Sequence, residues 1–280
     1  MKLSERLKAV KNLITPGLRV ADVGCDHGYL AIRLIRNGIS PHVIAMDINR
    51  GPLERAREHV TEAGLEGEID LRLSDGLAEL APGEAECIVM AGMGGSLMMR
   101  IMDEGSAVCA GAREFILQPQ SDIPMVRHYL EDEGYCITAE DIVYEDGKYY
   151  PMMKAVHRDP GVTPLLYCVY DKPGELPKGG EPSKDEELPK EGENPKEREL
   201  TGTDRRKLWQ EACYRYGGLL LEERHPILLE YIKYDGSQLA GVRDALLDSE
   251  QTEKVICRLE EITHDLKVAD EALRMISQIQ

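Results

Sequence analysis

The chain has 280 residues and a formal net charge of −17, a length that allows one large domain or two ordinary ones with an ample core. No apolar run approaches the ~18 residues of a membrane span, and no long apolar segment of the signal-peptide type follows the Lys/Arg-rich start. Seven cysteines without a C-x-x-C pair fit neither a disulfide framework nor a zinc site, so we expect reduced thiols, a cytoplasmic protein and no metal.

The charge is unevenly spread along the chain. Residues 1–50 hold eight Lys/Arg against four Asp/Glu, whereas residues 51–150 hold seven against 21. A strongly acidic chain argues against a polyanionic partner. Salt screens charges that lie more than about 10 Å apart, however, so a polyanion responds mainly to the charges near its binding face. The basic N-terminal part can therefore still bind a polyanion.

A glycine-rich loop near the N-terminus is the strongest functional signal. The amphipathic pattern of residues 2–14 predicts a helix, and the apolar run 18–23 predicts a first strand. Gly24 and Gly28 follow before the next helical pattern, an arrangement in which backbone N–H groups and a helix N-terminus face a ligand. Asp26 stands where a dinucleotide fingerprint has its middle glycine. The alternative is a glycine turn that binds nothing.

Acidic or glycine-rich turns also follow the next three predicted strands. Asp47 follows the strand 42–46, about 20 residues after the loop. A carboxylate at this position binds the two hydroxyls of a ribose; alternatively, Asp47 only caps the helix 50–61. Asp75 follows the strand 69–73, where it accepts from the amine of an adenine or forms an ordinary Asx turn. Glycines follow the strand 87–90 and let a backbone approach a ligand closely.

The remaining elements complete an α/β fold. Helices 96–110 and 122–132 flank a strand at 114–117, and two strands, 135–144 and 148–157, form a hairpin. The pattern predicts a Rossmann-like domain with a mostly parallel sheet and a terminal antiparallel hairpin. The predicted loops lie at the carboxyl ends of strands, the edge where ligands sit in such sheets.

The C-terminal half has a different composition. In residues 171–202, ten residues are Pro or Gly and sixteen are charged, which indicates a mobile low-complexity insert. Beyond it, heptad patterns predict an α-helical antiparallel coiled-coil domain, with Asp235 as one polar exception in the seam and Gly236 weakening the first helix. We expect domains at 1–158 and 204–280, joined by a linker at 159–203.

Taken together, several motifs resemble one family. The D-x-G-x-[G/D]-x-G loop is similar to motif I of class I S-adenosylmethionine (SAM) methyltransferases. The wider set resembles the bacterial tRNA (adenine-22, N1)-methyltransferase family and comprises Leu3-Ser4-x-Arg6-Leu7, Ala21-Asp22-x-Gly24-x-Asp26-His27-x-Tyr29-Leu30, Asp75-Gly76-Leu77, Ala91-Gly92-Met93-Gly94-Gly95, Gln118-Pro119 and Tyr144-x-x-Gly147-Lys148-x-Tyr150. The resemblance covers residues 1–157 closely and the helices after 203 loosely; the acidic insert departs from it.

The resemblance implies SAM as the cofactor and tRNA as the substrate. Asp26 then stabilises the adenine as it becomes cationic, His27 orients Asp26 or the base, and Tyr29 offers a stacking face. The expected cofactor-binding residues are Asp22, Gly24, Cys25, Gly28, Asp47, Ile48, Asp75, Gly76, Gly92, Met93 and Gly94.

Two other functions stay open at this point. The acidic surface favours a methyltransferase that acts on a small molecule or a protein, and the coiled coil is compatible with a non-catalytic interaction protein. We expect a monomer, with basic residues early in the helical region that help to hold the tRNA, namely Arg205, Arg206, Lys207, Arg215 and Arg224.

Overall fold

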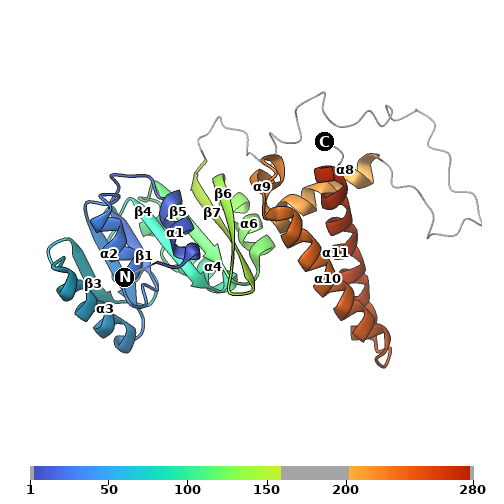
Figure 1. Ribbon diagram of the computed structural model, residues 1–280, viewed down its shortest axis with the longest axis horizontal. Helices are drawn as coiled ribbons and strands as arrows, with labels where there is room; N and C mark the ends of the chain where they lie inside the picture. The colour runs from blue at the N-terminus through green and yellow to red at the C-terminus, as the bar shows by residue number, and fades with distance from the viewer. Residues whose placement is uncertain (1–2, 159–201, 278–280) are drawn as a thin grey trace, which may run out of the picture. The chain divides into compact units, whose positions relative to one another are not determined.

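The structure of the protein is a computed structural model that describes residues 3–158 and 202–277 (Figure 1). The described residues fall into two compact units, one of residues 3–158 with Glu223–Leu228 and the other of residues 202–222 with 229–277. The insert at 171–202 and the linker at 159–203 lie outside the described residues up to position 201, so the expectations about them stay predictions.

The first unit alternates strands and helices around one sheet. In chain order the elements are α1 (Glu5–Leu13), β1 (Val20–Val23), α2 (Tyr29–Arg36), β2 (Val43–Asp47), α3 (Arg50–Ala63), β3 (Ile69–Leu73), β4 (Cys87–Met93), α4 (Gly95–Glu104), α5 (Ser106–Cys109), β5 (Glu114–Pro119), α6 (Ile123–Asp132), β6 (Tyr135–Glu145) and β7 (Lys148–His157). The strand order is β3-β2-β1-β4-β5-β7-β6, and β7 runs antiparallel to both of its neighbours. The predicted mostly parallel sheet with a terminal hairpin is confirmed.

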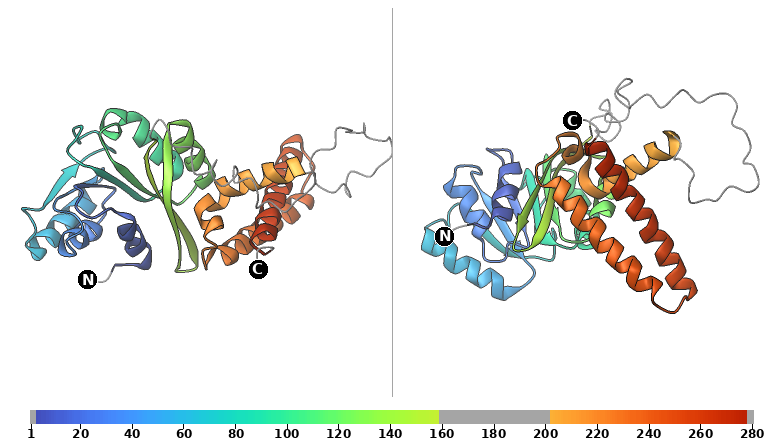
Figure 2. Two further views of the ribbon diagram at one scale, coloured as in Figure 1. Left: turned by 90° about the horizontal axis from the view of Figure 1, so that it is seen from above. Right: turned by 45° about the vertical axis from the view of Figure 1, so that its right-hand side comes forward.

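Helices cover both faces of this sheet (Figure 2). Apolar residues of α1, α2 and α3 pack on one face together with Val20, Val43 and Val89, while α4, α5 and α6 pack on the other face together with Ala21, Met46 and Met90. Strands buried on both sides explain the continuous apolar runs in the sequence. Because the faces are covered, the loops that follow the strands offer the polar edge at which a ligand can bind.

The largest differences from the predicted boundaries concern β4 and the helix that follows it. Strand β4 continues three residues beyond the expected Met90, and its pairing with β5 shifts register between Ala91 and Met93. The expected helix 96–110 is divided at Gly105 into α4 and α5. A Cβ at Gly105 would lie 2.6 Å from Leu77 Cδ1, so only glycine fits at this close approach.

The second unit is entirely helical in its described part. It contains α8 (Gly202–Ala212), the π-helix η1 (Cys213–Gly217), α9 (Gly218–Glu222), α10 (Leu228–Leu247) and α11 (Glu253–Ser277). Helices α10 and α11 lie side by side as a hairpin (Figure 1). Gly217 and Gly218 do not break the chain of helices, because the backbone passes through the π-turn of η1 directly into α9. Gly236 does not interrupt α10 either.

The polar exception in the heptad pattern has a structural reason. Asp235 accepts hydrogen bonds from Arg215 Nε at 2.7 Å and from the Tyr216 hydroxyl at 2.8 Å. Arg215 also lies 3.0 Å from a carboxylate oxygen of Asp265. The carboxylate in the seam therefore gives the buried hydroxyl of Tyr216 an acceptor and also binds Arg215. Arg215 is engaged within the fold, which corrects its assignment to a tRNA-holding cluster.

No described helix combines the length and the apolar composition that crossing a membrane requires.

Candidate methyl-transfer site

The loop between β1 and α2 has a strained backbone that its sequence accommodates. Gly24, Asp26 and Gly28 all have positive φ, at 75°, 50° and 72°. Glycine adopts this region freely, and Asp tolerates it better than most residues. The amides of Gly24 and Cys25 donate to the Met46 carbonyl at 2.8 and 2.9 Å. These two amides are therefore used inside the fold, and the loop presents a carboxylate and the start of α2 instead.

Three carboxylates meet beside this loop. Asp26 is exposed, Asp47 is nearly buried at the end of β2, and Asp22 is buried in β1. Asp47 accepts from the Asn49 amide at 2.8 Å through Oδ1 and from the Asp26 amide at 3.3 Å through Oδ2. Its remaining lone pairs can accept ribose hydroxyls, as the sequence predicts.

Asp22 is the most unusual of the three. Its side chain is buried, and Oδ2 has no hydrogen-bond partner within the described ranges. Burial raises the pKa of Asp22 to about 7, and the nearby charge of Asp47 adds to the rise. A buried carboxylate oxygen without a donor fits a cationic ligand such as the amino group of SAM. The unpaired oxygen of Asp22 therefore makes this site compatible with SAM.

Cys25 lies in the same acidic surroundings. Burial, followed by the charges of Asp22 and Asp47, raises the pKa of the Cys25 thiol. The thiol therefore stays protonated at neutral pH and is unsuited to nucleophilic chemistry.

The residues expected at the adenosine end lie after β2 and β3. Ile48 is 58% exposed directly after Asp47, so its apolar side chain is accessible to a ligand at this edge. The carboxylate of Asp75 is also exposed and lies 4.0 Å from Arg100. Gly76 has a φ of +56°, and a Cβ there would lie 2.9 Å from Ile101. Gly76 is thus required for packing, whereas a direct cofactor contact by it stays a prediction.

The glycines after β4 bring that strand against the first loop. Gly92 has a φ of +85° at the register shift between β4 and β5. The side chain of Met93 packs against Gly24, where an added Cβ would lie 3.1 Å from Met93 Cε. Gly94 caps α4. The Met93 contact places the end of β4 next to the loop that holds Asp26, whereas cofactor contacts by Gly92 and Gly94 stay predictions.

An aromatic cluster flanks Asp26, and one member was missed at the sequence level. His27 Nε2 lies 3.5 Å from Asp26 Oδ1. The ring centroids of His27 and Tyr29 are 5.5 Å apart, and those of Tyr29 and His59 are 4.9 Å apart. His59 Nδ1 lies 3.0 Å from the His27 carbonyl, so this nitrogen carries the proton. His59 lies one turn after Ala56, which packs on Gly28, so a contact of the folded chain and not a sequence pattern brings His59 to this cluster.

A second group of missed residues lies at the ends of β4 and β5. Arg6 Nη1 donates to Gln118 Oε1 at 2.9 Å, and the guanidinium carbon lies 5.5 Å from the centre of the Tyr150 ring. The same nitrogen would be 2.9 Å from a Cβ on Gly92. The sequence motifs contain all of these residues, but nothing in their spacing shows that they meet.

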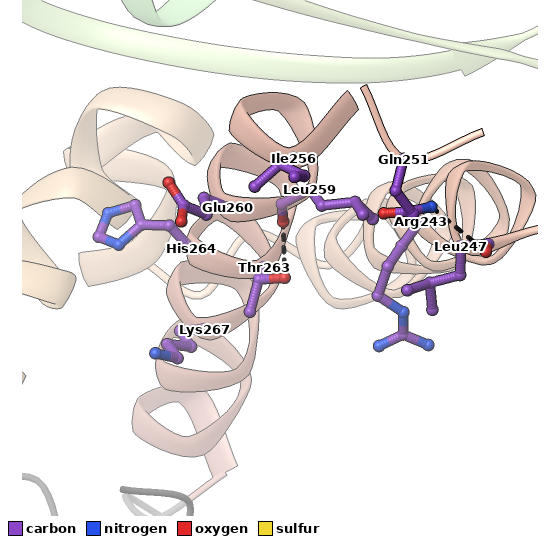
Figure 3. A pocket seen from close by; sticks show the side chains of 9 residues that line it. All are labelled: Arg243, Leu247, Gln251, Ile256, Leu259, Glu260, Thr263, His264 and Lys267. Carbon is purple, nitrogen blue, oxygen red and sulfur yellow. Dashed lines mark hydrogen bonds between the residues drawn. The ribbon is translucent and has the colours of Figure 1, made fainter. Parts of the chain in front are cut away.

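Other features of the described residues offer no competing site. No group of three or more His, Cys, Asp or Glu in residues 3–158 and 202–277 is arranged to hold a metal. A groove in the second unit is lined by side chains of the α10–α11 hairpin (Figure 3). It includes Leu247, Ile256 and Leu259 and contains none of the residues that the sequence predicts for SAM.

Comparisons with known proteins identify the family. The methyltransferase-domain family matches residues 3–153. The tRNA (adenine(22)-N(1))-methyltransferase of Bacillus subtilis is 38% identical over 155 residues, which cover 55% of this chain and 65% of that protein. The crystal structure of the B. subtilis m1A22 tRNA methyltransferase TrmK superposes with a TM-score of 0.74 at 26% identity, covering 97% of this chain and 99% of that one. The chain belongs to the methyltransferase-domain family.

Another solved structure shares the fold. M. capricolum TrmK, solved in complex with S-adenosyl-homocysteine (SAH), has a TM-score of 0.70 at 20% identity and covers 99% of this chain and 100% of that one. The expected methyltransferase domain and the Rossmann-like fold with a helical C-terminal region are confirmed, while SAM as the cofactor stays a prediction. The individual site residues stay predictions, which the geometry above supports.

Proposed function

We propose that this protein transfers a methyl group from SAM to N1 of adenine 22 in tRNA. The observation that carries the proposal is the acidic edge formed by Asp22, Asp26 and Asp47, in a chain that is similar to an enzyme named for this reaction. SAM supplies an electrophilic methyl group on a sulfonium. The residues of the chain bind it, orient the base and stabilise the charge that develops.

The cofactor is held by carboxylates at the ends of neighbouring strands. Asp22 pairs with the ammonium group of SAM through its otherwise unpartnered oxygen. Asp47 accepts the ribose hydroxyls, and Asp75 accepts from the adenine amine. The exposed side chain of Ile48 covers one face of the adenine ring. None of these groups carries a positive charge that would repel the sulfonium.

Asp26 acts on the target base. The lone pair of adenine N1 attacks the methyl carbon in line, so no general base is needed before transfer, and the methylated base is cationic. The Asp26 carboxylate is exposed beside the loop, where it can approach the base and stabilise that positive charge. It can also accept a proton from the exocyclic amine. His27, 3.5 Å away, orients the carboxylate.

The base must leave its stack to reach this site. N1 lies on the Watson–Crick edge of adenine, so an enzyme that methylates it must splay the nucleotide out. Tyr29 provides a half-buried ring beside Asp26, and His59 backs it. Stacking on such a ring contributes roughly 1–3 kcal/mol per base in other nucleic-acid-binding proteins.

The proposal also covers the organisation of the chain. A SAM-binding domain at 1–158, a linker at 159–203 and a helical domain at 204–280 act as a monomer in the cytoplasm, where tRNA is the partner. Light scattering after size-exclusion chromatography tests the oligomeric state.

Incorporation of label from tritiated SAM into bulk unmodified tRNA tests the activity. Label in the RNA supports the proposal. Label that appears only in a protein or small-molecule fraction contradicts it and favours the second class of methyltransferase.

A further inference from the structure

Arg6 lies near the methyl-transfer site but has no role in the reaction proposed above. We propose that Arg6 is the anion-binding residue of the methyl-transfer site, which takes either the carboxylate of SAM or a phosphate of the tRNA strand. The inference rests on the proposed function, since both anions belong to its substrates. The two share one chemistry, a negatively charged oxygen group that a guanidinium binds through parallel hydrogen bonds.

The guanidinium of Arg6 is fixed in place by two neighbours. Its Nη1 donates to Gln118 Oε1 at 2.9 Å, and Tyr150 lies beneath it with its ring centre 5.5 Å away. Gln118 is itself fully buried, with its Nε2 donating to the Pro119 carbonyl at 3.0 Å. One of the five N–H donors of Arg6 is therefore used by Gln118, and the others remain for a ligand.

Arg6 also lacks a counter-charge. No carboxylate lies within 4 Å of its guanidinium among residues 3–158 and 202–277, although the side chain is half-buried. The fully buried Arg127 is paired with Glu140 at 2.8 Å, and the half-buried Arg72 is paired with Glu84 at 2.8 Å. A partly desolvated cation without a counter-charge is costly unless an anion binds it.

The start of α1 is anchored so that Arg6 cannot drift from this position. The amides of Glu5 and Arg6 donate to the carboxylate of Glu145 at 2.7 and 3.2 Å, and the Leu7 amide donates to Ser4 Oγ at 3.2 Å. A carboxylate at a helix N-terminus is favourable. Since Glu145 belongs to the β6–β7 hairpin, the helix that carries Arg6 is tied to the same sheet edge as Tyr150.

Two contacts place this guanidinium beside the methyl-transfer site. A Cβ at Gly92 would touch Arg6 Nη1 at 2.9 Å, so the missing side chain leaves room for the arginine. The next residue, Met93, reaches the Gly24 loop. An anion bound by Arg6 thus lies at the carboxyl end of β4, next to β1 and its loop. The amino-acid end of SAM and the backbone of a splayed nucleotide are the two anions that come to this edge.

A ligand pair tests the carboxylate. Calorimetry measures the affinity of SAH and of 5′-methylthioadenosine, which has no carboxylate, for wild type, Arg6→Gln and Arg6→Lys. If Arg6 binds the carboxylate, Arg6→Gln weakens the binding of SAH by roughly 10- to 100-fold and leaves the affinity for methylthioadenosine unchanged. Arg113→Gln is the matched control, because Arg113 is an exposed arginine just before β5, at the opposite edge of the sheet.

A salt titration tests the phosphate. The dissociation constant of tRNA is measured in the presence of SAH between 50 and 200 mM KCl. If Arg6 binds a phosphate, Arg6→Gln lowers the slope of log K against log salt by about one, while Arg6→Lys keeps it. Arg113→Gln should leave both SAH affinity and the slope as in wild type.

Either selective loss supports the inference. The inference is overturned if Arg6→Gln changes neither the preference for SAH over methylthioadenosine nor the salt dependence of tRNA binding. It is also overturned if Arg6→Gln and Arg6→Lys melt at a lower temperature and weaken SAH and methylthioadenosine equally, since that result assigns Arg6 to packing alone. Failure of the proposed function gives a different result, because wild type itself would then bind no SAH or transfer no methyl group to tRNA.

Discussion

Replacing Asp26 by Asn separates catalysis from binding. The change keeps the size of the side chain and removes its negative charge. Asn, like Asp, tolerates the positive φ of 50° at this position, so the loop should keep its shape. Asp26 does not hold the cofactor in our account, because the buried Asp22 and Asp47 do. We therefore expect SAM affinity to change by less than about fivefold, equivalent to about 1 kcal/mol.

The expected loss of rate is larger. The Asp26 side chain is 70% exposed in the protein alone. Two opposite charges 4 Å apart interact by about 1 kcal/mol in water and about 4 kcal/mol near a protein surface. A bound nucleotide that covers the site moves the pair toward the second value. Loss of a preorganised charge interaction of this kind typically costs on the order of 10²–10³ in rate.

Asp26→Gly is the matched control for the backbone. Glycine adopts a φ of +50° without strain, so this variant should melt at or above the temperature of wild type. Its methyl-transfer rate should fall as far as that of Asp26→Asn. Single-turnover kinetics beside calorimetry for SAM measures both quantities. A rate near that of wild type in either variant, or a parallel loss of rate and SAM affinity, would refute the role given to Asp26.

Three further predictions concern stability and the division of labour between domains. The pKa of Asp22 is raised to about 7, so the native protein binds more protons than the unfolded chain between pH 4 and 7 and loses on the order of 4 kcal/mol of stability as pH rises through this window. Asp22→Asn should flatten the dependence of the melting temperature on pH between pH 5.5 and 8 and should weaken SAM binding. An unchanged pH dependence would contradict the raised pKa of Asp22. Asp235→Ala should lower the urea midpoint by the equivalent of about 2 kcal/mol, because it leaves a buried hydroxyl and an arginine short of a partner. Asp244→Ala, an exposed change in the same helix, should have no effect, and equal losses would disprove the explanation. Deletion of 203–280 should abolish tRNA methylation and spare SAM affinity; normal methylation by the truncated chain would show that the helical domain does not hold tRNA.

The strands and the ligand edge were predictable because their signals are local. Apolar runs ended by turn residues mark the central parallel strands, and strands 69–73 and 148–157 have the predicted bounds. The carboxylates at strand ends follow from the same boundaries. The end of β4 was not predictable, because glycine carries no side-chain periodicity and a register shift is set by the neighbouring strand.

The missed residues depend on contacts between distant parts of the chain. Arg6 meets Gln118 across 112 positions, and no periodic pattern reports such a pair. His59 has the helical spacing of a surface residue, and only the packing of α3 on the Gly28 loop brings it to Tyr29. Asp235 was visible as an exception in a heptad, but its partners became clear only with the π-turn of η1.

The position of the methyl group in the RNA tests the central claim most directly. Two unmodified tRNA transcripts that differ only in having A or G at position 22 are incubated with the protein and labelled SAM, and the products are mapped by primer extension. Methylation at N1 blocks the Watson–Crick edge, so we predict incorporation of label and an extension stop next to position 22 in the A22 transcript alone. Equal labelling of the two transcripts, or a stop at another nucleotide, would contradict the account.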